Sequence, residues 1–145
     1  MLKFQLLQII AINLNSYMPK FSKNSADKLA TCHSDLQKIF NEIIKTRDCV
    51  IICGARTLEQ QQAAFKGGFS KLDGIKKKSK HQVSKEQPLS LAVDALPYPI
   101  NWKDEKGHEA FARAVKATAQ HLKIKLVWGG DWKTFPDRPH FELGA

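Results

Sequence analysis

Apolar residues recur at helical spacing along two stretches of the chain, and a third stretch is rich in glutamine and alanine. The first stretch follows Ser25 and predicts a single helix over residues 25–45. Two further helices are predicted at 58–65, where Thr57 is a suitable cap, and at about 108–121. The apolar positions of the first helix lie three or four residues apart and are expected in the core: Leu29, Cys32, Leu36, Ile39, Phe40, Ile43 and Ile44.

Short apolar runs between these helices predict strands at residues 50–53, 91–96, 124–128 and 141–143. Segment 67–80 is rich in glycine and lysine and lacks periodicity, which is typical of a loop. A few short strands flanked by helices indicate a small α+β domain with a short antiparallel sheet.

The chain has 145 residues, enough to bury one hydrophobic core, and contains no internal repeat or interdomain linker. We assign residues 18–145 to a single domain and residues 1–17 to an N-terminal extension. The apolar run in this extension is too short to span a bilayer and lacks a clear cleavage site. It is interpreted as the result of an upstream start codon or as a packing segment, with a weak export signal as the alternative.

The formal net charge is +9, which favours a polyanionic partner such as nucleic acid or the anionic bacterial envelope. Many of the lysines lie in segment 71–80, which is either a solvated loop or a binding surface. No recognised nucleic-acid-binding motif accompanies them. The three cysteines form no CxxC pair, so we expect reduced thiols, with Cys53 packed in a strand.

The last part of the chain carries the first candidate chemistry. Asp137 precedes His140 by three residues in a segment of aromatics, glycines and prolines, and His140 stands at the entrance of the strand 141–143. A metal-bound water needs a ligand on a rigid element and a nearby carboxylate that does not itself bind the metal. Asp137 and His140 can supply these two functions if the chain provides further ligands.

Two further ligand candidates are His81, after the lysine-rich segment, and Asp94, inside the strand 91–96. A carboxylate within an apolar strand is costly if it is buried without a partner. Metal coordination satisfies it, and a salt bridge to Arg56 or Arg138 is the alternative. Together with His140, these residues would form a His₂Asp set, the three-ligand pattern of a catalytic zinc site.

With these motifs in this order, the sequence resembles the D-alanyl-D-alanine metallopeptidase family, zinc peptidases that cleave peptidoglycan stem peptides. It is most similar to the L-alanyl-D-glutamate endopeptidases of phage endolysins. The resemblance covers roughly residues 20–145. It is carried by Asn24-Ser25 with its helix, Gly54-Ala55-Arg56-Thr57 with Glu59-Gln60-Gln61, Ser79-Lys80-His81, Ala92-Val93-Asp94, Gly129-Gly130-Asp131-Trp132 and Asp137-Arg138-Pro139-His140-Phe141.

The resemblance implies one zinc ion, held in a cleft on the sheet by His81, Asp94 and His140. It also implies that Asp137 is the general base and that Arg56 contacts the substrate. Ser79 is expected to orient His81 or the substrate, or to be a simple loop hydroxyl. Glu142 is a candidate to hydrogen-bond a metal ligand without touching the metal itself, because side chains alternate along the strand and Glu142 faces away from the side of Phe141.

The chain departs from the family at one place. The family usually separates its first histidine and its aspartate by six residues, whereas twelve lie between His81 and Asp94 here. An insertion at about 85–90 accounts for the difference, and Pro88 within it suits a surface loop. If the loop bulges outward while its ends stay paired, ligation by His81 survives.

The resemblance implies an endolysin that cuts the L-Ala–D-Glu bond of the wall. Because the sequence shows no convincing signal peptide, we expect it to be made in the host cytoplasm and released at lysis. Nothing in the sequence requires more than a monomer. A D-Ala–D-Ala carboxypeptidase is the alternative within the same chemistry. The sequence is also compatible with a non-catalytic basic module that binds the wall or nucleic acid, and with a zinc domain without catalysis.

Overall fold

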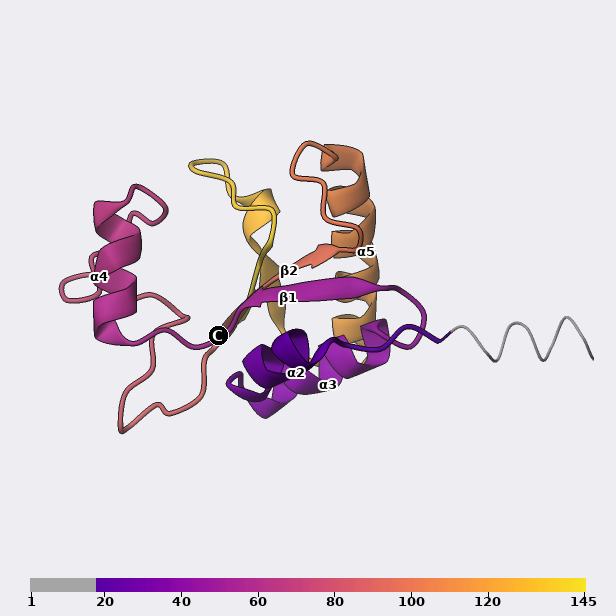
Figure 1. The fold of residues 1–145 in the computed structure, drawn as a ribbon, viewed down its shortest axis with the longest axis horizontal. Coiled ribbons are helices and arrows are strands. Elements are labelled where there is room, and N and C mark those ends of the chain that lie inside the picture. Colours follow the sequence, from indigo (N-terminus) through magenta and orange to yellow (C-terminus); the bar gives the residue numbers. More distant parts are fainter. Residues whose placement is uncertain (1–17) are drawn as a thin grey trace, which may run out of the picture.

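The structure of the protein is a computed structural model that describes residues 18–145. Its centre is a four-stranded sheet in the order β1-β2-β4-β3, in which every neighbouring pair is antiparallel (Figure 1). The strands are β1 (Cys49–Cys53), β2 (Ala92–Pro97), β3 (Leu126–Trp128) and β4 (His140–Leu143). The α+β class and the antiparallel sheet are therefore confirmed.

Within residues 18–145, three α-helices accompany this sheet, whereas a fourth stands apart from it. Figure 1 shows α2 and α3 together beside β1 and α5 beside β2, with α4 on the opposite side of the molecule. A short 3-10 helix, η1, connects β3 to β4. The bounds are α2 (Lys23–Ala30), α3 (Ser34–Ile43), α4 (Leu58–Lys66), α5 (Glu105–His121) and η1 (Gly129–Asp131).

The two faces of the sheet have different neighbours. Val93 and Ala95 of β2 belong to the hydrophobic core with Phe141 of β4. Since side chains alternate along a strand, the residues between them, including Asp94, face away from this core. The sheet thus separates a hydrophobic layer from a polar cluster. The helices contribute to the hydrophobic layer mainly Leu29, Leu36, Ile39, Phe40, Ile43, Phe111, Ala112, Val115 and Ala119.

The prediction of a single helix over residues 25–45 is wrong, because this segment forms two helices, α2 and α3. At the break, the Ser90 carbonyl accepts a hydrogen bond from the His33 amide, and the Ser90 amide donates one to the Thr31 carbonyl. The His33 ring then caps α3 by accepting from the Asp35 amide at 3.1 Å. The apolar stripe continues across the break because Cys32 remains fully buried.

Other boundaries differ from the prediction by only a few residues. α5 begins at Glu105 instead of 108, since the Asp104 side chain caps it by accepting from the Gly107 amide at 3.0 Å. β3 begins at Leu126 instead of 124, and β4 includes His140. Within residues 18–145, no helix is both long and apolar enough to cross a membrane. The proposed extension, residues 1–17, lies outside the part of the chain that the structure describes.

A buried hydroxyl joins α2 to the edge strand β1. Ser25 is 2% exposed, and its Oγ accepts a hydrogen bond from the Ile51 amide at 3.0 Å. Ser25→Ala is expected to destabilise the protein by about 1–3 kcal/mol, because a buried amide loses its acceptor. Urea unfolding measures the change in the free energy of unfolding. Ser84→Ala is the control, because the Ser84 hydroxyl is exposed, and its free energy of unfolding should stay within about 0.5 kcal/mol of the wild-type value. Equal stabilities of the two variants would contradict this role of Ser25.

Candidate functional site

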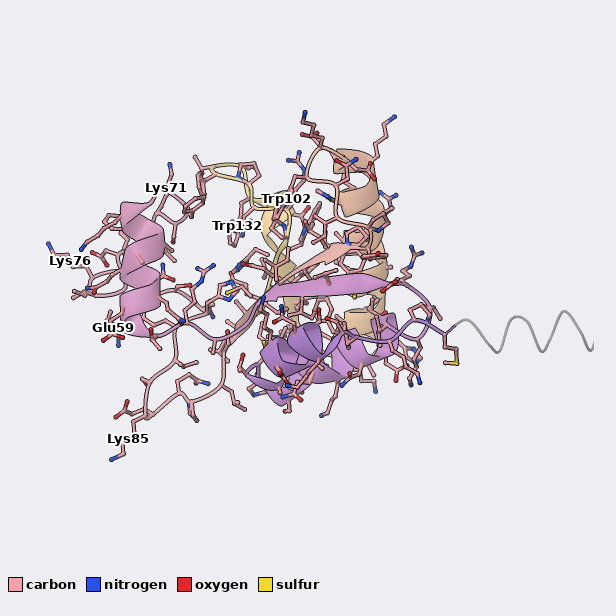
Figure 2. The ribbon with its side chains drawn as sticks, viewed as in Figure 1. Glu59, Lys71, Lys76, Lys85, Trp102 and Trp132 are labelled. Carbon is pink, nitrogen blue, oxygen red and sulfur yellow. The ribbon has the colours of Figure 1, made fainter. Side chains whose placement is uncertain are left out.

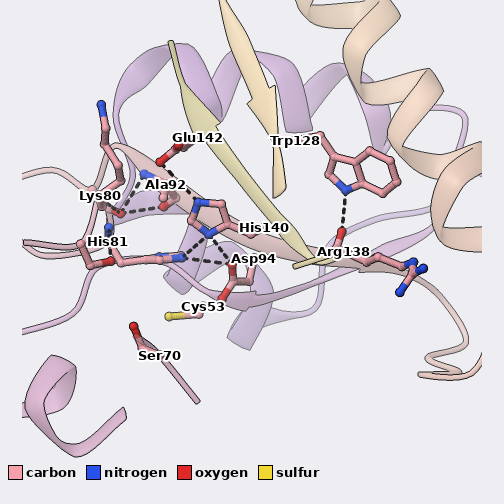
Figure 3. Close-up of polar contacts among 12 residues, drawn as sticks. Cys53, Ser70, Lys80, His81, Ala92, Asp94, Trp128, Arg138, His140 and Glu142 are labelled. Carbon is pink, nitrogen blue, oxygen red and sulfur yellow. Dashed lines mark hydrogen bonds and ion pairs between the residues drawn. The ribbon is translucent and has the colours of Figure 1, made fainter. Parts of the chain in front are cut away.

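Three side chains predicted as ligands converge on the polar face of the sheet (Figure 3). His81 Nε2 lies 3.0 Å from Asp94 Oδ1 and 3.1 Å from His140 Nδ1. His140 Nδ1 lies 3.2 Å from the same Asp94 oxygen. All three residues are buried. The structure therefore brings together residues that are separated by up to 59 positions in the chain.

The sheet register accounts for two of these positions. Asp94 in β2 is paired directly with His140, the first residue of β4. On the other side, Asp94 is paired with Cys53, next to a bulge in β1. Cross-strand neighbours lie on the same face of a sheet, so this pairing places the carboxylate and the imidazole side by side.

His81 reaches the cluster from the loop that follows the lysine-rich segment. Its Nδ1 lies 2.8 Å from the Gly54 carbonyl oxygen, which can only accept a hydrogen bond. Nδ1 therefore carries the proton, and in neutral imidazole Nε2 offers its lone pair to the cluster. Gly54 is required for this approach, since a Cβ there would lie 2.3 Å from Thr31 Oγ1 and 2.4 Å from the Lys28 carbonyl.

The donor set fits a divalent metal ion. A neutral His81 would direct a lone pair at a carboxylate oxygen, which is unfavourable unless a proton or a cation lies between them. Ligand atoms about 2.0–2.1 Å from a tetrahedral zinc ion lie roughly 3.3 Å apart, close to the three distances described above. Two imidazoles and one carboxylate could thus hold such an ion and leave a fourth position open.

Without a metal, protons compensate the charge of this cluster. Burial lowers the pKa of His81, but hydrogen bonds to Asp94 and Cys53 and the charge of Asp94 raise it to about 10. The pKa of His140 is also raised, because hydrogen bonds to Asp94 and Glu142 outweigh its burial. Burial raises the pKa of Asp94, but hydrogen bonds from both imidazoles hold it well below its usual range.

Metal binding at pH 7 is therefore expected to release protons. His81, with a pKa near 10, is an imidazolium at this pH and must lose a proton before Nε2 can coordinate. We expect at least about one proton released per zinc ion and an affinity that rises between pH 7 and 9. Titration calorimetry in two buffers of different ionisation enthalpy measures the release, and identical heats in both buffers would contradict it.

Asp137 lies at the edge of the cluster and is partly exposed. Its carboxylate offers an oxygen within 4.8 Å of the ligand atoms of Asp94 and His140. Burial and the charge of Asp94 raise its pKa above the ordinary value, despite the neighbouring cations. Gly129 sets the position of this loop: its carbonyl accepts from the Asp137 amide at 2.9 Å, and a Cβ on Gly129 would lie 2.4 Å from the Asp137 carbonyl oxygen.

Arg56 borders the cluster next to Asp94. Its Nη2 lies 3.5 Å from Asp94 Oδ2, and its Nη1 donates to Gln61 Oε1 at 3.2 Å. The salt bridge considered for Asp94 thus exists with Arg56, while Arg138 pairs with Glu105 at 3.2 Å. Because the imidazoles contact Oδ1 and Arg56 contacts Oδ2, the salt bridge and metal ligation are compatible.

Ser79 does not face open space. It is 9% exposed, and its Oγ accepts a hydrogen bond from the His81 amide at 3.1 Å. The contact fits the expectation that Ser79 orients His81. The nearby Cys53 lies beside the cluster, with its thiol within 4.8 Å of the ligand atoms of His81 and Asp94.

Three further side chains lie close to the cluster, and the position of Cys53 among them was not expected from the sequence. Cys53 was expected only to pack in a strand, and its place beside the cluster depends on its pairing with Asp94 across the sheet. The Trp132 ring lies 5.0 Å from that of His140. Glu142 Oε2 lies 3.5 Å from His140 Nε2, at the long limit of a hydrogen bond, which fits the supporting position suggested by strand alternation.

The predicted insertion between His81 and Asp94 leaves their contact intact. The Leu91 amide donates to the Lys80 carbonyl at 2.9 Å, so the two ends of the segment 81–90 are paired. The Arg56 amide donates to the His81 carbonyl at 2.8 Å and fixes this side of the loop. Lys85, within the insertion, lies at the outer edge of the molecule (Figure 2).

Comparisons with known proteins identify the family of the chain. The family model described as "Phage L-alanyl-D-glutamate peptidase" matches residues 17–143. Among solved structures, the chain is similar to the Serratia marcescens L-Ala D-Glu endopeptidase ChiX, with 26% sequence identity and a TM-score of 0.72. The match covers 90% of this chain and 95% of that one. Sequence and fold agree over nearly the whole length: the chain belongs to the phage L-alanyl-D-glutamate peptidase family.

Proposed function

We propose that the protein is a zinc-dependent endopeptidase that cleaves the L-Ala–D-Glu bond of peptidoglycan stem peptides during cell-wall lysis. The observation that carries the proposal is the convergence of His81, Asp94 and His140, with the carboxylate of Asp137 beside them. Membership in a family of peptidases supports the reaction class, and the similarity to ChiX, an L-Ala D-Glu endopeptidase, supports the bond.

We assign zinc as the ion because of the ligand types. Two imidazole nitrogens and one carboxylate oxygen are common ligands of catalytic zinc, whereas structural zinc sites are usually closed by four ligands, often thiolates. When bound, a zinc ion supplies Lewis acidity to the scissile carbonyl and lowers the pKa of water towards about 7. Within this assignment His81, Asp94 and His140 hold the ion.

In this proposal, the other residues handle protons and position the substrate. Asp137 accepts the proton of the attacking water and passes it to the leaving amine. Its raised pKa improves its ability to hold that proton between the two steps. Arg56 is held by Asp94 and Gln61 and directs its charge towards the substrate, either its carboxylate or the scissile carbonyl oxygen. Ser79 keeps His81 in position.

The surroundings of the reaction follow from charge and family. The substrate is the stem peptide, and the net charge of +9 favours approach to an anionic wall. Specific recognition of nucleic acid is not proposed, because the sequence carries no recognised nucleic-acid-binding motif. We propose that a monomer is sufficient, because the three ligand candidates and Asp137 belong to one chain. The protein would be made in the host cytoplasm, released at lysis, and act on the bacterial cell wall.

Mass spectrometry of digested peptidoglycan tests the proposal. New amino termini at D-Glu are expected, lost on treatment with a zinc chelator and restored by added zinc. Release of only a terminal D-Ala would assign a carboxypeptidase instead. No cleavage by folded, zinc-loaded protein would leave a binding module, which strongly salt-dependent affinity for DNA or for the wall would then identify.

A further inference from the structure

The helix that stands apart from the sheet belongs to a cationic and apolar projection. We define the α4 lobe as residues 58–78, that is, α4 and the loop after it. Figure 2 shows its labelled residues Glu59, Lys71 and Lys76 on the opposite side of the molecule from α5. The metal cluster does not include any residue of the lobe, and the lobe residue used in the proposed chemistry is Gln61, which accepts from Arg56. That chemistry leaves the exposed side chains of the lobe unexplained.

Large apolar side chains are exposed on this lobe. Phe69 is 84% exposed and Ile75 is 63% exposed, while Leu58 and Phe65 of α4 are 42% and 45% exposed. Leu58 and Phe65 are seven residues apart and therefore share a face of the helix. Four large apolar side chains are thus exposed on this one lobe, and exposed apolar side chains that gather in one region mark interaction surfaces.

The same lobe carries a strong positive charge. Its five lysines stand against two acidic residues, Glu59 and Asp73, so its net charge is +3. Asp73 is also engaged within the lobe, since its Oδ1 accepts from the Ile75 amide at 2.9 Å and from the Lys77 amide at 3.0 Å. The lysines are all exposed and lie at positions 66, 71, 76, 77 and 78.

Internal hydrogen bonds hold these side chains in place. Gln61 is fully buried and donates to Ser70 Oγ at 3.0 Å and to the Leu72 carbonyl at 2.8 Å. Gly74, with φ of +83°, turns the loop, and its carbonyl accepts from Gln82 Nε2 at 2.9 Å. Because the loop is already ordered by these hydrogen bonds, little conformational entropy is lost when its apolar and basic side chains bind a partner.

From this composition we infer that the α4 lobe binds the surface of an anionic phospholipid bilayer. Apolar side chains at such a surface enter the boundary between headgroups and acyl chains, and lysines reach the headgroup phosphates. A fluid bilayer accommodates separately projecting side chains such as Phe69 and Ile75, whereas a folded partner would need matching pockets. The aliphatic members of the set, Leu58 and Ile75, distinguish it from the flat aromatic platforms that stack against sugars.

Vesicle flotation tests the inference and does not depend on peptide cleavage. The full-length protein is mixed with vesicles of phosphatidylglycerol and phosphatidylethanolamine, with vesicles of phosphatidylcholine, and with purified peptidoglycan sacculi. We expect binding to the anionic vesicles, weaker binding at high salt, and little binding to phosphatidylcholine. Digestion of isolated sacculi measures the peptidase activity separately from vesicle binding. Loss of digestion would therefore contradict the proposed function, whereas loss of vesicle binding would contradict only this inference.

Two sets of variants separate the contribution of the apolar side chains to vesicle binding from that of the lysine charges. Phe69→Ser and Ile75→Ser are each expected to weaken vesicle binding on the order of tenfold without changing the charge. Neutralising Lys76, Lys77 and Lys78 to serine should weaken it by about 100-fold, at about fivefold per lysine. All of these variants should still digest isolated sacculi.

Matched controls lie outside the lobe. Trp102→Ser removes an aromatic side chain that is 62% exposed, and neutralising Lys103, Lys106 and Lys125 removes the same charge from other exposed positions. Both controls should retain most of the vesicle binding. The inference would be overturned if control and lobe variants lost vesicle binding equally, or if the wild-type protein did not bind anionic vesicles. It would also be overturned if the lobe variants lost binding to sacculi but kept binding to vesicles.

Discussion

Replacement of Asp137 by alanine is expected to lower turnover by about 10²–10⁴-fold, the usual contribution of a positioned general base. The zinc content should remain at one ion per chain, because the three proposed ligands are untouched. Asp137→Asn should have a similar effect, since an amide fills the space but cannot accept the proton. Turnover of stem peptides and metal analysis of the same preparations measure the two properties.

The matched control is Asp131→Ala in the same segment. Asp131 is exposed and forms a salt bridge with Lys116, away from the ligand atoms. It should lose little activity. If the Asp137 variants keep wild-type turnover, the assignment of the base is wrong, whereas loss of zinc from them would move Asp137 into the set of ligands.

His81→Ala is expected to abolish both metal binding and cleavage. Removal of a direct ligand should weaken zinc affinity by more than about 100-fold, since even outer contacts to ligands contribute 10–100-fold. The variant also leaves Asp94 with one imidazole partner in a buried site, so part of its stabilisation is lost. Zinc affinity by competition with a chromogenic chelator and digestion of sacculi are the measurements.

His121→Ala is the control for this variant, because His121 is exposed at the end of α5. It should bind zinc with wild-type affinity. Retention of tight zinc by His81→Ala would show that another group replaces His81 as a ligand. Cys53 would be the first candidate, since its thiol is already within 4.8 Å of the cluster.

The sequence predicted the elements of the fold better than their ends. Helix periodicity located the helices, but it could not detect the break between α2 and α3, because Cys32 continues the apolar stripe through it. The break depends on hydrogen bonds to Ser90, which lies far away in the chain. The pair Ser34-Asp35 was the available local signal, as such residues are frequent at helix starts.

The sequence identified candidate residues for the site, but only the fold shows that their side chains lie close together. Asp94 was recognisable because a carboxylate in an apolar strand needs a partner, and His140 because it begins a strand next to Asp137. The contact of His81 with Gly54 and the position of Cys53 could not be predicted, since both depend on pairing between distant segments. The roles of the site residues themselves stay predictions until the variants are measured.

The paired ends of the segment 81–90 have a practical consequence. The hydrogen bond between Lys80 and Leu91 closes this excursion at its base, and the Arg56 amide holds the His81 carbonyl. The number of residues around Lys85 therefore hardly affects where His81 and Asp94 lie. Loop closure grows more costly only slowly with length. The tip around Lys85 is therefore a suitable place to graft a targeting peptide, which would redirect the protein to a chosen cell surface without rebuilding its interior.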